Sequence, residues 1–142
     1  MAAIFKVLLV DDEPDFLEYT AKRLRQRGLD IDVAPDATSA LAKLRQNPFH
    51  VVVLDIKMPG MDGRQLFHRI AADFPTIETV ILTGHGNVQM AFELSQQGVF
   101  EYLSKPCDID TLNDMIRKAR QYAIVRGDRV PPGPDAADPK AR

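Results

Sequence analysis

The sequence predicts an α/β fold in which helices cover both faces of a parallel sheet. Five short apolar segments alternate with five segments whose apolar residues recur at helical spacing. Three of the short segments are apolar almost throughout, which is typical of strands that are covered on both faces. A strand–helix alternation requires crossover connections, and these give parallel strands rather than a sandwich or a helical bundle.

The strands follow from the apolar runs and their polar boundaries. Three central strands are expected at residues 4–10, 51–54 and 79–82, where aliphatic and β-branched residues follow one another. Polar and apolar residues alternate at residues 29–33, and the segment 100–103 is short and mixed. Both patterns indicate strands at the edges of the sheet.

The helices are expected where apolar residues recur every three or four positions. Pro14 suits a first helical position, and Gly28 suits the end of the same helix. The other four helices are predicted at residues 37–44, 66–74, 88–97 and 109–123.

One folded domain is expected at residues 1–125, followed by a flexible tail at residues 126–142. The tail holds four prolines, two glycines and one large apolar residue. It therefore cannot bury enough apolar surface to offset the entropy of ordering.

Charge and cysteine content exclude several classes of protein. The formal net charge of −2 argues against a broad surface for nucleic acid. The single cysteine, Cys107, cannot form an internal disulfide, and no residues have zinc-ligand spacing. No apolar run approaches the ~18 residues that a membrane helix needs, and the N-terminal run is too short for a signal peptide. We expect a cytoplasmic protein that binds neither nucleic acid directly nor a membrane.

Polar residues that follow the predicted strands form one candidate site. Asp11 and Asp12 follow the first strand, and Asp55 follows the third. Thr83 follows the fourth strand, and Lys105 follows the fifth. Each has an ordinary explanation when taken alone, such as a helix cap, a turn or a solvated surface. Because the carboxyl ends of parallel strands meet at one edge, however, these side chains should converge on one pocket.

The converging residue types indicate phosphoryl chemistry. Clustered carboxylates repel one another and favour a bound cation, and oxygen ligands suit Mg²⁺. A divalent cation, an ammonium group and a hydroxyl match the charge of a transferring phosphoryl group. A carboxylate within reach can itself attack and form an acyl phosphate. These arguments do not decide which carboxylate is the nucleophile.

Four short motifs, in this order, resemble the receiver domain of two-component response regulators. They are Asp11-Asp12, Asp55 with the sequence MPGMDG at residues 58–63, Thr83-Gly84 and Lys105-Pro106. The resemblance covers residues 4–124. It implies a flavodoxin-like, doubly wound (βα)5 three-layer sandwich whose five-stranded parallel sheet has the order 2-1-3-4-5. The stretches TGHG and VFEYLSKP are most similar to receivers of NtrC-type regulators, which precede AAA+ transcription activators.

The resemblance assigns the phosphoacceptor and the metal ligands. Asp55 would take the phosphoryl group from the phosphohistidine of a sensor histidine kinase or a histidine phosphotransfer protein. Mg²⁺ would be held by Asp12, Asp55 and the backbone carbonyl of Lys57, with Asp11 acting largely through water. Such a domain is not an enzyme on other molecules, because it catalyses only its own phosphotransfer and dephosphorylation.

The resemblance also assigns four supporting residues. Lys105 would pair with one phosphoryl oxygen, and Thr83 would move to hydrogen-bond another. Tyr102 would be the aromatic switch that turns inward when Thr83 moves. Pro106 would follow a cis peptide bond, which is a minority conformation even before proline.

Output is expected to pass through a downstream protein partner. The resemblance places the phosphorylation-dependent surface on the fourth helix, fifth strand and fifth helix. We expect a single-domain regulator that is a monomer or a phosphorylation-dependent dimer. The alternatives are an excised receiver of a larger transcriptional regulator and a phosphorylation-independent scaffold.

The roles of Lys57 and His85 stay open, and two other classes of protein are weighed against the receiver domain. Lys57 could pair with Asp12 or Glu13 before metal binds, or it could face solvent. His85 is expected to be a surface loop residue rather than a base. A haloacid dehalogenase phosphatase would want an Asp-x-Asp pair after the first strand, and a flavodoxin would want Ser, Thr and Gly there. The sequence DDEP fits neither class.

Overall fold

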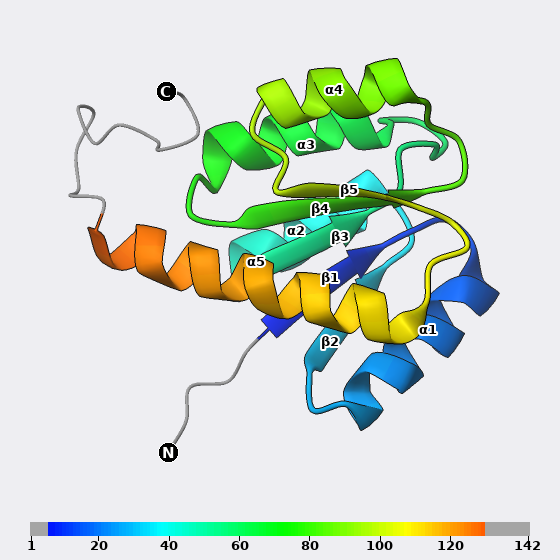
Figure 1. Ribbon diagram of the computed structural model, residues 1–142, viewed down its shortest axis with the longest axis horizontal. Helices are drawn as coiled ribbons and strands as arrows, with labels where there is room; N and C mark the ends of the chain where they lie inside the picture. Colours follow the sequence, from blue (N-terminus) through cyan, green and yellow to red (C-terminus); the bar gives the residue numbers. More distant parts are fainter. Residues whose placement is uncertain (1–5, 130–142) are drawn as a thin grey trace.

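Five parallel strands form the central sheet in a computed structural model that describes residues 6–129 (Figure 1). Their order is β2-β1-β3-β4-β5, as predicted. The part of the first predicted strand at residues 4–5 lies outside the described residues. The strands are β1 (Lys6–Val10), β2 (Asp30–Ala34), β3 (Val51–Leu54), β4 (Glu78–Thr83) and β5 (Glu101–Ser104).

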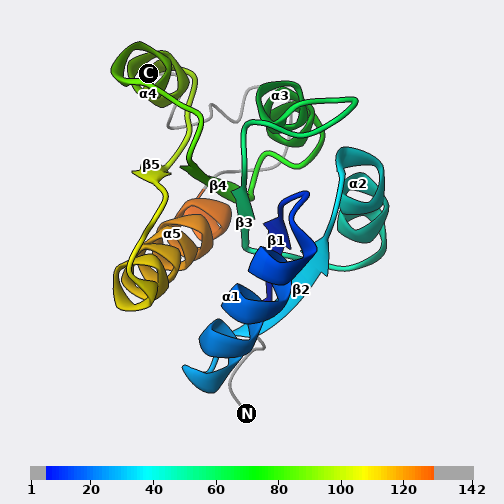
Figure 2. The same cartoon turned by 90° about the vertical axis from the view of Figure 1, so that its right-hand side faces the viewer.

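Five helices cover the two faces of this sheet. Helices α1 and α5 pack on one face, and α2, α3 and α4 pack on the other (Figure 2). The sheet and its two helix layers form the predicted three-layer sandwich. The helices are α1 (Pro14–Gln26), α2 (Ala37–Gln46), α3 (Gly63–Asp73), α4 (Val88–Gln96) and α5 (Ile109–Arg129).

The sheet divides the apolar interior into two cores. Side chains of a strand alternate between the faces, so Leu8 joins the core under α2 and α3 while Leu9 joins the core under α1 and α5. All four residues of β3 and all six of β4 are buried, because helices cover both faces. The central strands are therefore rigid supports that end at one shared edge.

Four of the helix starts are stabilised by side chains that accept hydrogen bonds from backbone amides. Asp108, before α5, accepts one of 3.1 Å from the Thr111 amide. Asp36 caps α2 and Asn87 caps α4. Asp62 caps α3 and forms a capping box with Gln65, which satisfies two amides at once. The third helix therefore begins at Gly63, at the end of the MPGMDG motif and ahead of the first apolar residue of its pattern, Leu66.

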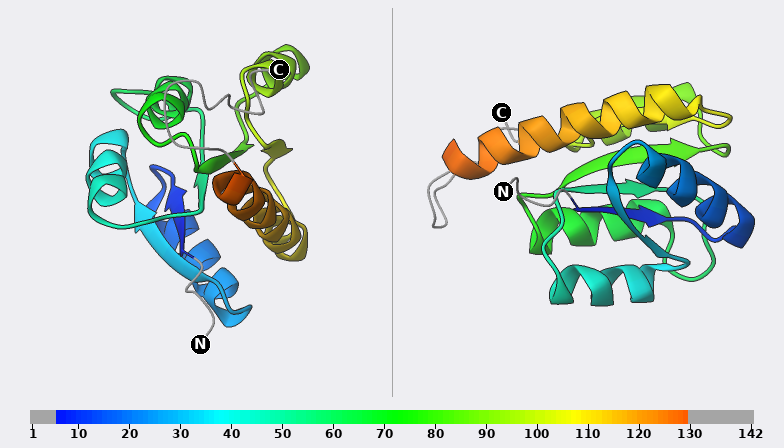
Figure 3. Two further views of the ribbon diagram at one scale, coloured as in Figure 1. Left: turned by 90° about the vertical axis from the view of Figure 1, so that its left-hand side faces the viewer. Right: turned by 90° about the horizontal axis from the view of Figure 1, so that it is seen from below.

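Helix α5 is longer than predicted (Figure 3). It continues through Arg129, so the predicted start of a flexible tail at residue 126 is wrong for residues 126–129. A single glycine at position 127 costs a helix only about 1 kcal/mol, and the first proline comes at position 131. The rest of the predicted tail, residues 130–142, lies outside the described residues. None of the helices in the described range has the length and apolar character needed to cross a bilayer.

Candidate functional site

The side chains that were predicted to converge meet at the carboxyl edge of the sheet. Asp11 directly follows β1, Asp55 directly follows β3, and Thr83 is the last residue of β4. Their exposed fractions are only 1%, 3% and 1%. Because the buried central strands end here, they carry two carboxylates and a hydroxyl into a place that water hardly reaches.

Lys105, just after β5, places its ammonium group among these carboxylates. Its Nζ lies 2.6 Å from Asp11 Oδ2 and 3.4 Å from Asp55 Oδ2. A third carboxylate oxygen, Glu13 Oε1, lies at 3.3 Å. The ring of Phe16 completes this environment, since its centroid lies 4.0 Å from Nζ. The lysine thus joins residues that are far apart in sequence.

The pKa shifts of Asp11 and Lys105 reflect the balance between burial and the contacts of the ammonium group with the carboxylates. Burial raises the pKa of the Asp11 carboxyl, and the hydrogen bonds from Lys105 and the Glu13 amide only partly oppose that effect. Burial acts to lower the pKa of Lys105, but the hydrogen bond to Asp11 and the charges of Asp11 and Asp55 outweigh it and raise the pKa. The charge of the Asp11 carboxylate is therefore only partly compensated, while that of the lysine is well compensated.

The clustered carboxylates fit a small divalent cation. Asp11, Asp12 and Asp55 each offer one oxygen atom, and these three atoms lie within 4.8 Å of one another. Asp12 is exposed, which leaves one side of the cluster open to water. Carboxylate oxygens with room for water are the environment that Mg²⁺ prefers. The predicted ligand role of the Lys57 carbonyl stays a prediction.

The loop after β3 is held close to Asp55 by a glycine. A Cβ atom on Gly63 would lie 2.0 Å from the Asp55 carbonyl oxygen and 2.6 Å from the Ile56 Cα atom. The Gly63 amide also donates a hydrogen bond of 2.7 Å to the Ile56 carbonyl. Only a residue without a side chain allows this approach. The MPGMDG motif alone does not predict this packing of Gly63 against the site.

The Thr83 hydroxyl faces the β4–α4 loop, where Oγ1 accepts a hydrogen bond of 3.1 Å from the His85 amide. The Thr83 carbonyl accepts one of 2.9 Å from the Lys105 amide, which ties the ends of β4 and β5 together. The peptide bond between Lys105 and Pro106 is cis, as predicted. His85 itself is exposed, in agreement with a surface loop residue.

Two further predicted residues lie beside the cluster rather than in it. The side chain of Lys57 is exposed and forms no ion pair within the described range, which favours the solvent-facing alternative. Tyr102 is half-buried and packs against the core under α4. Glu13 and Phe16 contact Lys105 but were not assigned to the site. Their only sequence signal was their position directly after the first strand.

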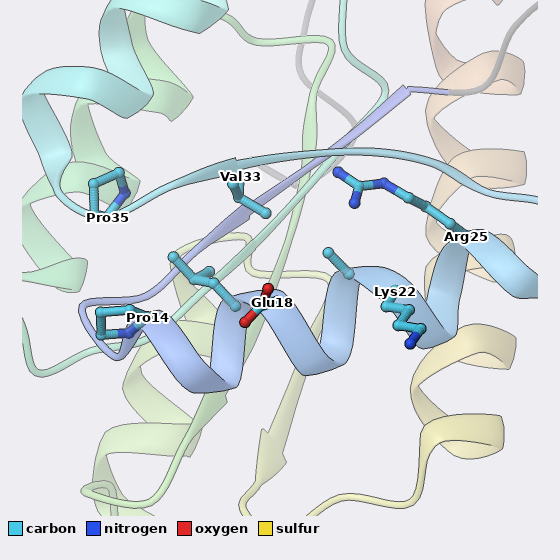
Figure 4. Close-up of a pocket in the computed structure, with 8 residues that line it drawn as sticks. Pro14, Glu18, Lys22, Arg25, Val33 and Pro35 are labelled. Carbon is cyan, nitrogen blue, oxygen red and sulfur yellow. The ribbon is translucent and has the colours of Figure 1, made fainter.

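Two of the cavities along α1 differ in their relation to the site. The larger, about 650 Å³, follows α1 and β2 and includes none of the cluster residues (Figure 4). A smaller cavity of about 420 Å³ lies beside Lys105 and is lined by residues of α1 and of the β5–α5 connection. Only the smaller cavity is continuous with the site.

Comparison with known proteins identifies the family. The profile of the response regulator receiver domain matches residues 7–117. The C4-dicarboxylate transport transcriptional regulatory protein DctD of Rhizobium meliloti is 36% identical over 121 residues, which are 85% of this chain and 26% of that protein. The transcriptional regulatory protein GlrR of Escherichia coli is 38% identical over 122 residues, or 86% of this chain and 28% of that protein. The chain thus spans about a quarter of the length of these curated relatives.

A solved structure agrees with these sequence matches. The crystal structure of a response regulator receiver domain protein from Clostridium thermocellum superposes with a TM-score of 0.81 at 31% identity. The superposition covers 86% of this chain and 98% of that one. The predicted flavodoxin-like fold and the similarity to receivers of NtrC-type regulators are both confirmed. This chain belongs to the response regulator receiver domain family.

Proposed function

We propose that this domain accepts a phosphoryl group on Asp55 from the phosphohistidine of a sensor histidine kinase or a histidine phosphotransfer protein. The observation that carries this proposal is the Lys105 ammonium group, which lies between Asp11 and Asp55 beside three clustered carboxylate oxygens. Fixed positive charge beside an available carboxylate is what an incoming phosphoryl group requires.

The hydrogen bonds favour Asp55 over Asp11 as the nucleophile. Both Asp11 oxygens are engaged, Oδ1 by the Glu13 amide at 3.0 Å and Oδ2 by Lys105 at 2.6 Å. The two Asp55 oxygens have only long contacts of 3.4 Å, with the Lys57 amide and with Lys105. Usual N–H···O distances are about 2.9–3.0 Å, so the Asp55 oxygens are the less restrained pair.

The transfer forms one bond and breaks another. An Asp55 oxygen attacks the phosphorus atom, the phosphorus–nitrogen bond of the donor phosphohistidine breaks, and the departing imidazole nitrogen keeps the electron pair and takes up a proton. Water later attacks the phosphorus of the acyl phosphate, which releases inorganic phosphate and restores the Asp55 carboxylate. In this proposal the domain catalyses only these two reactions on itself.

Lys105, Thr83 and the acidic cluster have separate roles in this scheme. Lys105 would balance the charge of one phosphoryl oxygen, and Thr83 would donate its hydroxyl hydrogen to another. Asp11, Asp12 and Asp55, with the Lys57 carbonyl, would hold Mg²⁺. When bound, that ion supplies charge stabilisation for the transferring group.

We propose that output passes through the surface of α4, β5 and α5 to a downstream protein. Large apolar side chains are exposed there, with exposed fractions of 88% for Val88 and 64% for Phe92 on α4. Tyr122 and Val125 on α5 are also partly exposed. The domain would act as a monomer or as a phosphorylation-dependent dimer. The sequence matches to transcriptional regulators support a partner in transcriptional control.

The test is the intact mass after incubation with acetyl phosphate, with and without Mg²⁺. The expected result is a Mg²⁺-dependent gain of one phosphoryl group in the wild type and in Asp15→Asn, a control at an exposed carboxylate of α1. Asp55→Asn should gain none. A gain that persists in Asp55→Asn would contradict the assignment of the nucleophile.

A complete absence of phosphoryl uptake calls for a second probe. Beryllofluoride mimics a phosphoryl group on a carboxylate without requiring transfer. Binding of beryllofluoride would indicate a receiver that accepts only from its kinase. No binding would favour a phosphorylation-independent scaffold instead.

A further inference from the structure

Gly86 and Tyr102 make a close contact between the β4–α4 loop and β5. The position that a Cβ atom would take on Gly86 lies 1.1 Å from Tyr102 Oη and 2.5 Å from Cζ. Nonbonded carbon atoms need about 3.5–4.0 Å, so no side chain at position 86 fits beside the tyrosine. The ring of Tyr102 therefore occupies the space that a side chain at position 86 would need.

The same position also borders the residue that is proposed to move. It lies 3.3 Å from Thr83 Cγ2, so Gly86 stands where Thr83 and Tyr102 meet. The Tyr102 hydroxyl is buried there without a hydrogen-bond partner among the residues that the structure describes. Burial raises its pKa, against an opposing effect of the nearby Asn87 amide. Tyr102 thus points inward, with its hydroxyl beside Gly86.

We propose that Gly86 is a positioning residue of the switch, because its missing side chain admits the Tyr102 ring to the inward position. This inference rests on the proposed roles of Thr83 and Tyr102. The residue at position 86 then sets the balance between the inward and outward positions of the ring. If position 86 carried a side chain, the Tyr102 ring could take the inward position only when the loop moved. With glycine, the ring can take that position without any movement of the loop.

The ring rather than the loop is expected to yield when a side chain is added. The loop is held at both ends, by the His85 amide that donates to Thr83 Oγ1 at 3.1 Å and by the Met90 amide that donates to Asn87 Oδ1 at 2.8 Å. The tyrosine hydroxyl is the far end of a side chain that rotates about two bonds. Gly86→Ala should therefore turn Tyr102 outward into solvent.

The chain allows a direct measurement of this movement. It has three tyrosines and no tryptophan. Tyr19 and Tyr122 are 58% and 37% exposed, so Tyr19→Phe and Tyr122→Phe leave Tyr102 as the one tyrosine of a folded protein. In that background we expect Gly86→Ala to increase acrylamide quenching of tyrosine fluorescence several-fold. The pKa from tyrosinate absorbance should fall toward its ordinary value.

Gly84→Ala is the matched control, because a Cβ atom there would meet only Lys105 Cβ at 3.8 Å, an ordinary contact. It should leave the quenching of Tyr102 unchanged. Equal quenching in the Gly86→Ala variant and the parent would overturn the proposal.

A double-mutant cycle tests the pair itself. Gly86→Ala should lower the thermal midpoint when Tyr102 is present and have little effect on it in a Tyr102→Ala background. Additive changes in midpoint would reject the contact. If Gly86→Ala does not fold, recovery of folding in the double variant supports the proposal. If Gly86→Ala and the double variant both fail to fold while Tyr102→Ala folds, the proposal is rejected. The Tyr102 ring would then not be the cause of the misfolding.

These measurements use protein without a phosphoryl group, so they are separate from the test of the proposed function. Absence of phosphoryl uptake on Asp55 would remove the function and leave the Gly86–Tyr102 contact standing. If the wild type is phosphorylated, Gly86→Ala should also take up the group, because Gly86 does not contact the carboxylates. Its Tyr102 quenching should stay high after phosphorylation.

Discussion

At the scale of single residues, the charge of the site is unevenly shared. Lys105 approaches Asp11 more closely than Asp55, at 2.6 Å against 3.4 Å. Asp11 therefore holds the lysine in position, while Asp55 keeps its oxygens available. Even so, burial keeps the pKa of Asp11 raised, so the ionised Asp11 destabilises the metal-free fold.

Asp11→Asn should for this reason raise the thermal midpoint of the metal-free protein at neutral pH. An acid whose folded-state pKa is raised binds its proton more readily in the folded state, so the wild type gains stability as the pH falls through that folded pKa. The advantage of the variant should accordingly shrink in acid. Thermal unfolding between neutral pH and pH ~4, where the ordinary aspartate pKa lies, checks this sign. A variant that is less stable at neutral pH would show that the bond to Lys105 outweighs the burial of Asp11.

At the scale of elements, the edge strand β2 is shielded by side chains from the neighbouring helices. Arg25 of α1 donates hydrogen bonds of 2.8 and 3.2 Å to the Ile31 carbonyl. Lys43 of α2 donates one of 2.7 Å to the Val33 carbonyl. These carbonyls would otherwise be open to pairing with a strand of another molecule. Cationic side chains at an edge are a common protection against such pairing.

Lys43→Met should remove this protection on one side of β2. Loss of the hydrogen bonds to the Val33 carbonyl and to the Asp32 carboxylate is expected to cost about 1–2 kcal/mol in the free energy of unfolding. The variant should also aggregate faster near its thermal midpoint. Denaturant unfolding and light scattering measure the two effects, with Arg45→Met, an exposed position of the same helix, as control. Similar losses in both variants would mean that the edge contact has no special role.

Lys43 also forms an ion pair of 2.6 Å with Asp32 Oδ1, and the pH dependence of this pair is opposite in sign to that of Asp11. The hydrogen bond and charge of Lys43 lower the pKa of Asp32, against the opposing effect of burial. The ion pair between Lys43 and Asp32 therefore stabilises the fold above the ordinary aspartate pKa. This contribution is lost as the pH falls through the pKa that Asp32 has in the folded state. Asp11 and Asp32 thus respond to acid in opposite ways within one domain.

At the scale of the whole molecule, metal binding and folding are linked. The acidic cluster takes residues from two strand ends that come together only in the fold, so Mg²⁺ should bind the folded state alone. At a Mg²⁺ concentration of ~100 times its dissociation constant, the free energy of unfolding should rise by about 2.7 kcal/mol. Differential scanning calorimetry with and without Mg²⁺ checks this. Asp12→Asn should weaken the effect, and an equal rise in that variant would contradict the ligand assignment.

Features that depend on the local sequence pattern were predicted well. They are the strands, the helix starts and the residues at the strand ends. Val51–Leu54 was placed without error, because an uninterrupted apolar run has few other interpretations. Contacts that depend on tertiary distance were not predictable. The preference of Lys105 for Asp11 and the contact of Gly86 with Tyr102 are set by packing across strands. The end of α5 was missed because residues 126–129 were judged by the composition of the whole proline-rich segment that follows them.

The division of the interior by the sheet has a consequence for how such a domain can diversify. Tyr102 packs against the core under α2, α3 and α4, whereas Leu103 beside it packs against the core under α1 and α5. Substitutions in the two cores share few neighbours, so their effects on stability should be nearly additive. Each face can then accumulate changes without compensation from the other. A domain built in this way can acquire a new binding partner on one side while it keeps an old one on the opposite side.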